Sequence, residues 1–295
     1  MSQTEKVIQY YQGTQRDYKR FWMSSNSLAM HFGYYDETVR THDASLLKMN
    51  EVLARYAQIT SHDHILDAGC GFGGSTIWLA RMFGCQVKGI NIVPEQVEEA
   101  QHFARHHQVS DLAQFACMDF TRTTYADASF DVVWGLESAV HTDHKGAFVQ
   151  EAHRLLRTGG RLLLCEYLLR ESPPLSPEEH TELAPWLEGW AMPALLTPGD
   201  YARLFALNGF GCVQTYDLTD HVRRSLDHLG KLHLPTAPSI SILLPLARIL
   251  QTFHLLSAER VNNYRAGLCQ NRALHKGLWR YIVLVAEKTE QMAEQ

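Results

Sequence analysis

The sequence predicts an α/β protein built on a doubly wound, mostly parallel, seven-stranded sheet, with an N-terminal helical arm and helical cap insertions. Between residues 61 and 170, short apolar runs typical of buried strands alternate with amphipathic runs typical of helices. A turn with four glycines in six positions, GCGFGG at 69–74, lies between the first such strand and helix. After residue 170 the alternation stops in a segment rich in proline and tryptophan.

The elements follow from hydrophobic periodicity and from residues that start and stop helices. Phe148, Ala152 and Leu155 recur at helical spacing, and the sequence TGG at 158–160 is expected to stop that helix. Pro94 suits the first turn of another helix. We therefore predict strands over 64–68, 85–92, 113–118, 130–136, 161–169, 211–218 and 278–288, and helices over 74–83, 94–107, 144–156 and 199–208.

These elements divide the chain into six parts. Because 171–197 and 219–275 interrupt the alternation of strands and helices, we expect these segments to cover an edge of the sheet. The predicted parts are a helical arm or lid (1–60), a cofactor-binding core (61–170), a cap insertion (171–197), a core helix and strand (198–218), a mainly helical cap (219–275), and a closing strand with a tail (276–295).

The composition favours a small-molecule partner. With 27 Lys and Arg against 32 Asp and Glu, the net charge is −5, so no overall positive field attracts nucleic acid and no nucleic-acid partner is expected. The apolar stretch over 239–250 is too short to span a membrane. Since the first residues also lack a signal-peptide pattern, we expect a cytoplasmic protein without an integral membrane segment. Association into a homo-oligomer is left open.

The glycine turn and the acid before it indicate the cofactor. Gly69, Gly71 and Gly74 fit the G-x-G-x-x-G string of dinucleotide sites, so the string alone leaves a dinucleotide or an empty tight turn open. Asp67 stands directly before the turn, where a carboxylate would repel a pyrophosphate but accept hydrogen bonds from an ammonium group. S-adenosylmethionine carries an ammonium and a sulfonium and no phosphate, and is therefore the predicted cofactor.

The segments ILDAGCGFGG, GINIVPEQ, CMDF and FDVVWGLESAVHTDHKGAFVQEAHRLLRTGGRLLLCEY cover about residues 60–170 in order. With them the chain resembles the class I S-adenosylmethionine-dependent methyltransferases. The resemblance implies a Rossmann-like sheet and an enzyme in which the turn holds the methionine part of the cofactor, the end of the second strand the ribose, and CMDF the adenine. The implied cofactor-binding residues are Asp67, Gly69, Cys70, Gly71, Asn91, Ile92, Gln96, Asp119 and Phe120, with Tyr18 from the arm.

Asn91 departs from the pattern of many family members, which place a carboxylate at the end of the second strand. A carboxamide can still accept from one ribose hydroxyl and donate to the other. Asparagine there resembles the branch that acts on sterols, tocopherols and prenyl diphosphates. Two alternatives stay open, since Asn91 could cap the strand end and Asp119 could cap a turn.

The predicted catalytic residues are Glu137 and His141, just past the fourth strand. Methyl transfer to carbon, oxygen or nitrogen usually requires a carboxylate or imidazole near the reacting atom. Four residues apart at a helix start, the two side chains can share a face, with Glu137 as base or cation stabiliser and His141 assisting. The alternative is that Glu137 caps the helix and His141 packs on the cofactor. No metal ligand is predicted, although HTDH at 141–144 contains two histidines.

Aromatic residues of the arm and cap are the predicted acceptor site. The N-terminal segments resemble an arm that closes over the cofactor, and aromatic faces exclude water and can lie beside a cation. Alternatively, the aromatic residues of the arm could form an ordinary apolar stripe that packs into the core, and the tryptophans could form the core of the cap. The predicted substrate-binding residues are Tyr11, Trp22, His31, Tyr34, Trp186 and Trp190.

The segments FGCQVKGINIVPEQV, ESAVHTD and TYDLT resemble the isoprenoid carbon methylators. This implies methylation of a double bond in a small hydrophobic, isoprenoid-like acceptor, with Mg²⁺ if the acceptor is a prenyl diphosphate. Transfer to oxygen or nitrogen of a phenol, polyketide or amine is the second hypothesis, and a non-catalytic, cofactor-binding scaffold the third. Cationic candidates for a diphosphate site, which could equally form a solvated helix face, are Arg223, Arg224, His228, Lys231 and Arg265.

Overall fold

The computed structural model describes residues 1–230 and 257–290, so Lys231 and the apolar stretch over 239–250 lie outside the described residues. A seven-stranded sheet has the order β3-β2-β1-β4-β5-β7-β6. Neighbours among β1 to β5 are parallel, and β7 runs antiparallel to β5 and β6, which confirms the predicted fold class. The strands are β1 (His64–Ala68), β2 (Gln86–Asn91), β3 (Ala113–Cys117), β4 (Phe130–Leu136), β5 (Leu156–Leu169), β6 (Phe210–Asp217) and β7 (Trp279–Lys288).

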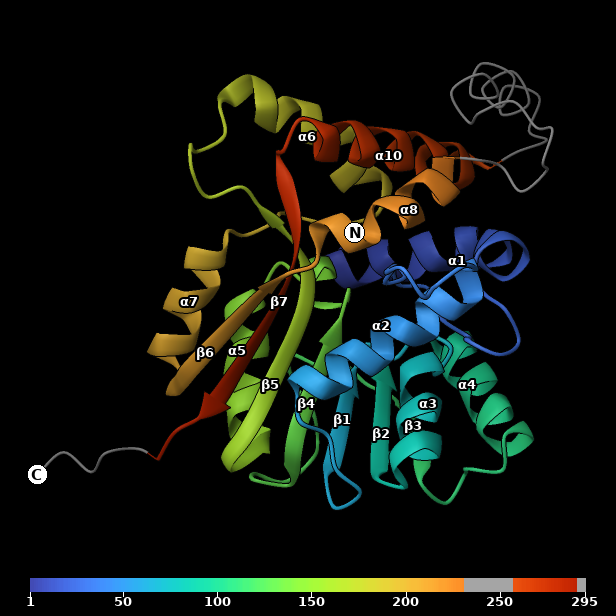
Figure 1. Ribbon diagram of the computed structural model, residues 1–295, viewed down its shortest axis with the longest axis vertical. Coiled ribbons are helices and arrows are strands. Elements are labelled where there is room, and N and C mark those ends of the chain that lie inside the picture. Colours follow the sequence, from blue (N-terminus) through green and yellow to red (C-terminus); the bar gives the residue numbers. More distant parts are fainter. Residues whose placement is uncertain (231–256, 291–295) are drawn as a thin grey trace, which may run out of the picture.

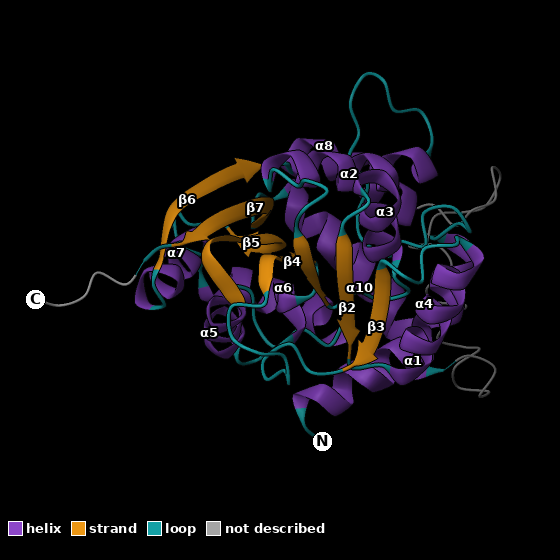
Figure 2. Ribbon diagram, turned by 90° about the horizontal axis from the view of Figure 1, so that it is seen from below, coloured by secondary structure: helices purple, strands orange, loops and turns teal. Residues whose placement is uncertain are grey.

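Helices cover both faces of the sheet, which explains why its central strands are apolar on both sides. Met49 of α2 (His42–Tyr56) and Ile77 of α3 (Gly74–Phe83) pack into one buried cluster, together with residues of α4 (Pro94–His106). Phe148 of α5 (Lys145–Leu155) and Phe205 of α7 (Pro198–Leu207) belong to the cluster on the other face. Figure 2 shows α2 and α3 on one side of the strands and α5 on the other.

Four further helices lie together at one end of the sheet (Figure 1): α1 (Gln3–Phe21), α6 (Pro177–Gly189), α8 (Thr219–Gly230) and α10 (Ala258–His275). The expected cover over a sheet edge is not found at the edge strand β6, which stays largely exposed, since the described α6 packs along α10 and α10 also contacts α1. Trp186 of α6 instead packs against Tyr167 of β5 and Trp279 of β7. Residues 231–256 of the predicted cap lie outside the described residues. No helix within the described ranges is long and apolar enough to cross a membrane.

The end of α5 also differs from the expectation. The helix ends at Leu155, and the glycines at 158–160 already belong to β5. The backbone N–H groups of Ala128 and Ser129 donate to the carbonyl oxygens of Arg154 and Leu155, at 3.0 and 2.9 Å. These two N–H groups therefore satisfy two of the last carbonyl oxygens of α5. The sequence pattern had instead predicted that the glycines end the helix.

Candidate active site

The glycine turn connects β1 to α3 where two other segments approach it closely. Gly69 has a φ of +98°, and a Cβ there would lie 2.4 Å from Cβ of Ser138, which follows β4. At Gly74 a Cβ would lie 2.6 Å from the carbonyl oxygen of Ser27, which follows α1. The turn therefore needs glycine because the arm and the segment after β4 press against it.

Asp67 lies beside this turn and is only 2 % exposed. The Thr76 hydroxyl donates to Asp67 Oδ2 at 2.6 Å. Burial raises the pKa of Asp67 to about 7, and the hydrogen bonds from Thr76 oppose this rise. A cation next to Asp67 would favour its ionised form, so the side chain suits an ammonium group.

One pocket brings the predicted residues together, with an empty volume of about 840 Å³ that includes its open side. The turn residues and Asp67 form one wall, and the arm, the segment after β4 and the chain after α6 form the others. No Lys or Arg of the described residues lines it. Of the predicted site residues, those that line this pocket are Asp67, Gly69, Cys70, Gly71, Glu137, His141, Tyr11, Tyr18, Trp22, His31 and Trp190.

Glu137 lies in the pocket wall with a φ of +52°, which is uncommon for a residue with a side chain. Its Oε1 accepts hydrogen bonds from the Phe32 N–H at 2.7 Å and the Tyr281 hydroxyl at 2.5 Å, and its Oε2 accepts from Tyr167. Burial raises the pKa of Glu137 to about 7, against the effect of these three donors. A carboxyl that titrates near neutral pH is suited to accept a proton.

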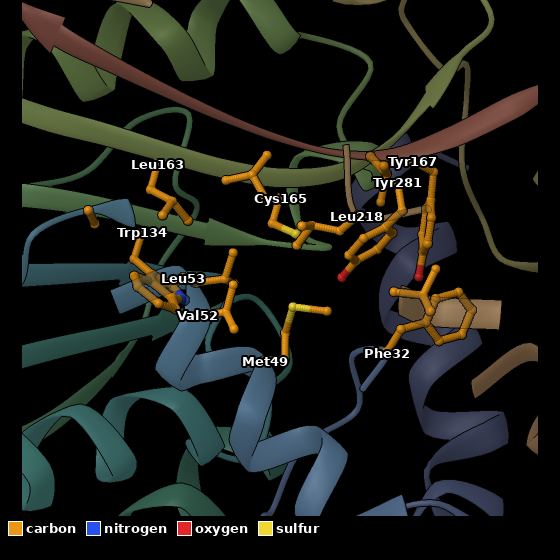
Figure 3. Close-up of a cluster of buried hydrophobic side chains, with 14 of the residues drawn as sticks. Phe32, Met49, Val52, Leu53, Trp134, Leu163, Cys165, Tyr167, Leu218 and Tyr281 are labelled. Carbon is orange, nitrogen blue, oxygen red and sulfur yellow. The ribbon is translucent and has the colours of Figure 1, made fainter. Parts of the chain in front are cut away.

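Sequence reasoning did not single out Tyr167 and Tyr281. They are directly paired across the antiparallel strands β5 and β7, and their rings lie 5.7 Å apart (Figure 3). Both hydroxyls donate to Glu137. Their only signal in the sequence is a polar group within each apolar strand, and nothing there reveals the pairing.

His141 lies in a short 3-10 turn, Ala139–His141, while Glu137 precedes this turn. The two side chains therefore line the same pocket, but they do not share a helix face, contrary to the expectation. Since His141 Nδ1 faces the carbonyl oxygen of Ala191, at 3.5 Å, Nε2 accepts the hydrogen bond from the Tyr11 hydroxyl at 2.9 Å. Burial lowers the pKa of His141 to about 4, so the imidazole is neutral at physiological pH.

Glu166 is a third residue that the sequence reasoning missed, and it binds the segment that follows Glu137. It is 1 % exposed, and its Oε1 accepts from the N–H groups of Ser138 and Ala139 at 3.1 and 2.8 Å. These groups open the turn that carries His141 and directly follow Glu137. Burial raises the pKa of Glu166 to about 8, and the nearby charge of Glu137 adds to this rise.

Asn91 and Gln96 are buried at the end of β2 and form a hydrogen bond, Asn91 Nδ2 to Gln96 Oε1, of 2.7 Å. Gln96 Nε2 is buried and has no hydrogen-bond partner among the described residues. A ribose hydroxyl would satisfy this nitrogen, so the pair fits the predicted cofactor. Neither residue lines the pocket described above.

The predicted adenine residues lie outside that pocket. Asp119 is exposed and its Oδ1 accepts from the N–H and hydroxyl of Thr121, both at 2.8 Å, so one carboxylate oxygen caps a turn. Phe120 packs edge-on against Phe148, with ring centroids 4.9 Å apart. Ile92 is half-buried after β2. The contacts of Asp119 and Phe120 with adenine, and of Ile92 with the cofactor, stay predictions.

Two predicted acceptor residues and the described cap cations do not line the pocket. Tyr34 stacks on His221 at 4.1 Å, and Trp186 is fully buried in the apolar layer behind Tyr167. These two aromatic residues form packing contacts because the cap and sheet share one core. The described cations of the suggested diphosphate site, none of which lines the pocket, are Arg223, Arg224, His228 and Arg265.

Within residues 1–230 and 257–290, no three His, Cys, Asp or Glu side chains converge in a way that could hold a metal ion. His144 of the HTDH sequence is exposed and lies 3.5 Å from Asp143.

The chain resembles known proteins in both sequence and fold. Residues 66–164 match the family model described as "Methyltransferase domain". The 27-O-demethylrifamycin SV methyltransferase of Amycolatopsis mediterranei is 38% identical over 144 residues, which are 49% of this chain and 53% of that protein. Ajmaline N-methyltransferase of Rauvolfia serpentina is 27% identical over 285 residues, covering 91% of this chain and 94% of the relative.

Among solved structures, geranyl diphosphate C-methyltransferase from Streptomyces coelicolor A3(2) aligns with a TM-score of 0.72 at 16% identity, over 98% of each chain. This likeness concerns the fold. The chain spans 53% to 66% of the length of three curated relatives that it matches. The names of these similar proteins specify methyl transfer to oxygen, to nitrogen or to carbon, so they do not identify the acceptor atom for this chain.

Proposed function

We propose that the chain, whose residues 66–164 match the methyltransferase domain model, is a class I S-adenosylmethionine-dependent methyltransferase whose acceptor is a small, uncharged, hydrophobic molecule. The observation that carries this proposal is the single pocket that joins the glycine turn and Asp67 to the buried carboxyl of Glu137. Its walls carry aromatic side chains and, within the described residues, no cation.

When bound, S-adenosylmethionine supplies an electrophilic methyl group on a sulfonium. In the proposal, Asp67 and the turn hold its amino-acid part, Asn91 and Gln96 its ribose, and Asp119 with Phe120 its adenine. Tyr11, Tyr18 and Trp22 of the arm exclude water from the reacting groups.

Carbon of an isoprenoid-like alkene is the first candidate acceptor atom. An alkene that gains a methyl cation becomes a carbocation and must then lose a proton from a neighbouring carbon. The Glu137 carboxylate would stabilise that charge and then take the proton, while the rings of Phe32 and Tyr167 face the same pocket. Because no described Lys or Arg lines the pocket, the acceptor is proposed to lack a diphosphate and to need no Mg²⁺.

Transfer to oxygen or nitrogen is the second candidate, and His141 is the observation that favours it. Its neutral imidazole lies in the pocket wall, and its Nε2 could take the proton of a phenol or amine if that acceptor displaced the Tyr11 hydroxyl, which donates to the same nitrogen. The names of the rifamycin and ajmaline relatives support this candidate, since they specify a 27-O-demethyl compound and transfer to nitrogen.

Methyl-¹³C S-adenosylmethionine distinguishes these candidates. The protein is incubated with prenyl alcohols, tocopherol precursors, alkylphenols, secondary amines and geranyl diphosphate, and the products are analysed by NMR. A methyl group on carbon supports the first candidate, and a methoxy or N-methyl product the second. Preference for geranyl diphosphate contradicts the uncharged acceptor, and micromolar binding of S-adenosylhomocysteine without any turnover favours a scaffold.

A further inference from the structure

The hydrogen bonds of the pocket residues suggest which polar group the acceptor carries. The Glu137 carboxyl already accepts from three protein donors, and His141 Nε2 accepts from Tyr11. Two buried side-chain nitrogens of pocket residues have no hydrogen-bond partner among the described residues: His31 Nε2 and Trp190 Nε1. A buried polar atom without a partner costs free energy, so a ligand that satisfies it binds more tightly.

The tautomer of His31 follows from its other ring nitrogen. Nδ1 lies 2.8 Å from the carbonyl oxygen of Phe32, which can only accept, so Nδ1 carries the hydrogen. Nε2 therefore presents a lone pair. Burial lowers the pKa of His31 to about 4, so the ring stays neutral at physiological pH and Nε2 remains an acceptor.

The segment around His31 is held rigidly next to Glu137. Trp22 Nε1 donates to the His31 carbonyl oxygen at 3.2 Å, and the Phe32 N–H donates to Glu137 at 2.7 Å. The Gly33 N–H donates to Ser225 Oγ at 2.9 Å. A side chain fixed in this way can orient a ligand without losing much further freedom.

We infer that His31 is a specificity-determining residue whose Nε2 accepts a hydrogen bond from a hydroxyl group of the methyl acceptor. The acceptor is then a lipophilic alcohol or phenol rather than a pure hydrocarbon, since a hydrocarbon would leave the lone pair buried and unpaired. The Trp190 indole N–H, the second unpartnered atom, would donate to an acceptor atom of the ligand. The inference rests on the proposed function and holds whichever atom receives the methyl group.

Two variants of His31 test the roles of its two ring nitrogens separately. Asparagine in His31→Asn can donate to the Phe32 carbonyl as Nδ1 does but has no atom at the position of Nε2, whereas His31→Gln can place an acceptor near that position. Calorimetry on protein loaded with S-adenosylhomocysteine would compare nonylphenol with nonylanisole, and geraniol with geranyl methyl ether. Each ether lacks the donor and keeps the apolar body.

The wild-type protein is expected to bind at least one hydroxylated probe about tenfold more tightly than its ether. His31→Asn should lose this preference and His31→Gln should recover part of it, with unchanged affinity for S-adenosylhomocysteine. The inference is overturned if the wild type shows no preference, if His31→Asn keeps it, or if cofactor affinity falls in parallel. If the binding pattern is as expected but no acceptor is turned over, the inference holds and the proposed function fails. If wild type and His31→Asn turn over the same acceptor at equal rates, the proposed function holds and the inference fails.

Discussion

Tyr281 on β7 donates its hydroxyl hydrogen to Glu137 Oε1 over 2.5 Å, although 144 positions separate the two residues in the chain. The contact connects the last strand of the sheet to the segment that follows β4. It stabilises the ionised form of a carboxyl whose pKa is raised by burial. The protonation state of Glu137, and thus its proposed chemistry, depends on this distant partner.

Glu137→Gln should lower turnover by about 100-fold or more while leaving cofactor affinity nearly unchanged, because a neutral amide cannot accept a proton. The measurements are kcat with the acceptor found by the NMR screen and the Kd of S-adenosylhomocysteine by calorimetry. The calorimetric value also serves as the folding control. A variant with the wild-type kcat would remove Glu137 from the mechanism.

Tyr281→Phe should move the pH dependence of turnover to higher pH. If the carboxylate is the active form, wild-type kcat rises as pH increases through about 7. Removing a donor that favours the carboxylate raises the pKa of Glu137, so the midpoint should shift upward by about one pH unit. Tyr281 does not line the pocket, so the KM for the acceptor should change little. A changed KM with an unmoved midpoint would contradict this role.

The free protein should lose stability as pH rises from 6.5 to about 8. Burial raises the pKa of Asp67 and Glu137 to about 7 and that of Glu166 to about 8, so their neutral forms stabilise the fold at low pH and this contribution disappears as pH rises through these values. His31 and His141, with pKa values lowered to about 4, act oppositely, but only below pH 6.5.

Glu166→Gln is the matched variant for this stability profile. It removes the titrating group and keeps an oxygen that can accept from Ser138 and Ala139. The decrease in Tm between pH 6.5 and 8, measured by scanning calorimetry at constant ionic strength, should therefore become smaller than in the wild type. An identical slope in both proteins would argue against a buried, neutral Glu166.

Gly69→Ala should destabilise the protein by more than Gly84→Ala. Both glycines have a positive φ, of +98° and +67°, so both substitutions incur backbone strain of about 1 kcal/mol. At Gly84 a Cβ meets nothing within 4 Å, whereas at Gly69 it clashes with Ser138. Denaturant unfolding should show an additional loss of about 2 kcal/mol for Gly69→Ala, together with weaker binding of S-adenosylhomocysteine. Equal losses of stability in the two variants would show that Ser138 moves away from the added Cβ without a cost in free energy.

The residues that follow parallel strands could be identified from the sequence. Asp67 is the penultimate residue of β1 and Glu137 follows β4, and the parallel pairing of these adjacent strands brings both to the same end of the sheet. Asn91 at the end of β2 was identified through the resemblance to the methyltransferase family. Hydrophobic alternation locates such strands because both of their faces are buried, and ligands bind where parallel strands end.

Residues that reach the site from antiparallel strands and from the cap could not be identified in this way. Tyr167 and Tyr281 meet only through the register of β5 and β7, which no local pattern encodes. Trp186 and Trp190 both looked like acceptor residues, yet only Trp190 lines the pocket. Their burial depends on how α6 packs against α10 and the sheet, which is a property of contacts distant in sequence.

The sequence by itself determined the α/β core and the glycine turn, predicted the cofactor class, and located Glu137 and His141 just past β4, because short-range periodicity and strand ends encode these features. Only the tertiary structure decided the protonation of these groups, the clash that requires Gly69, and the two unpartnered nitrogens of the pocket. Burial and hydrogen-bond partners set these properties, and both arise from segments that meet only in the folded chain.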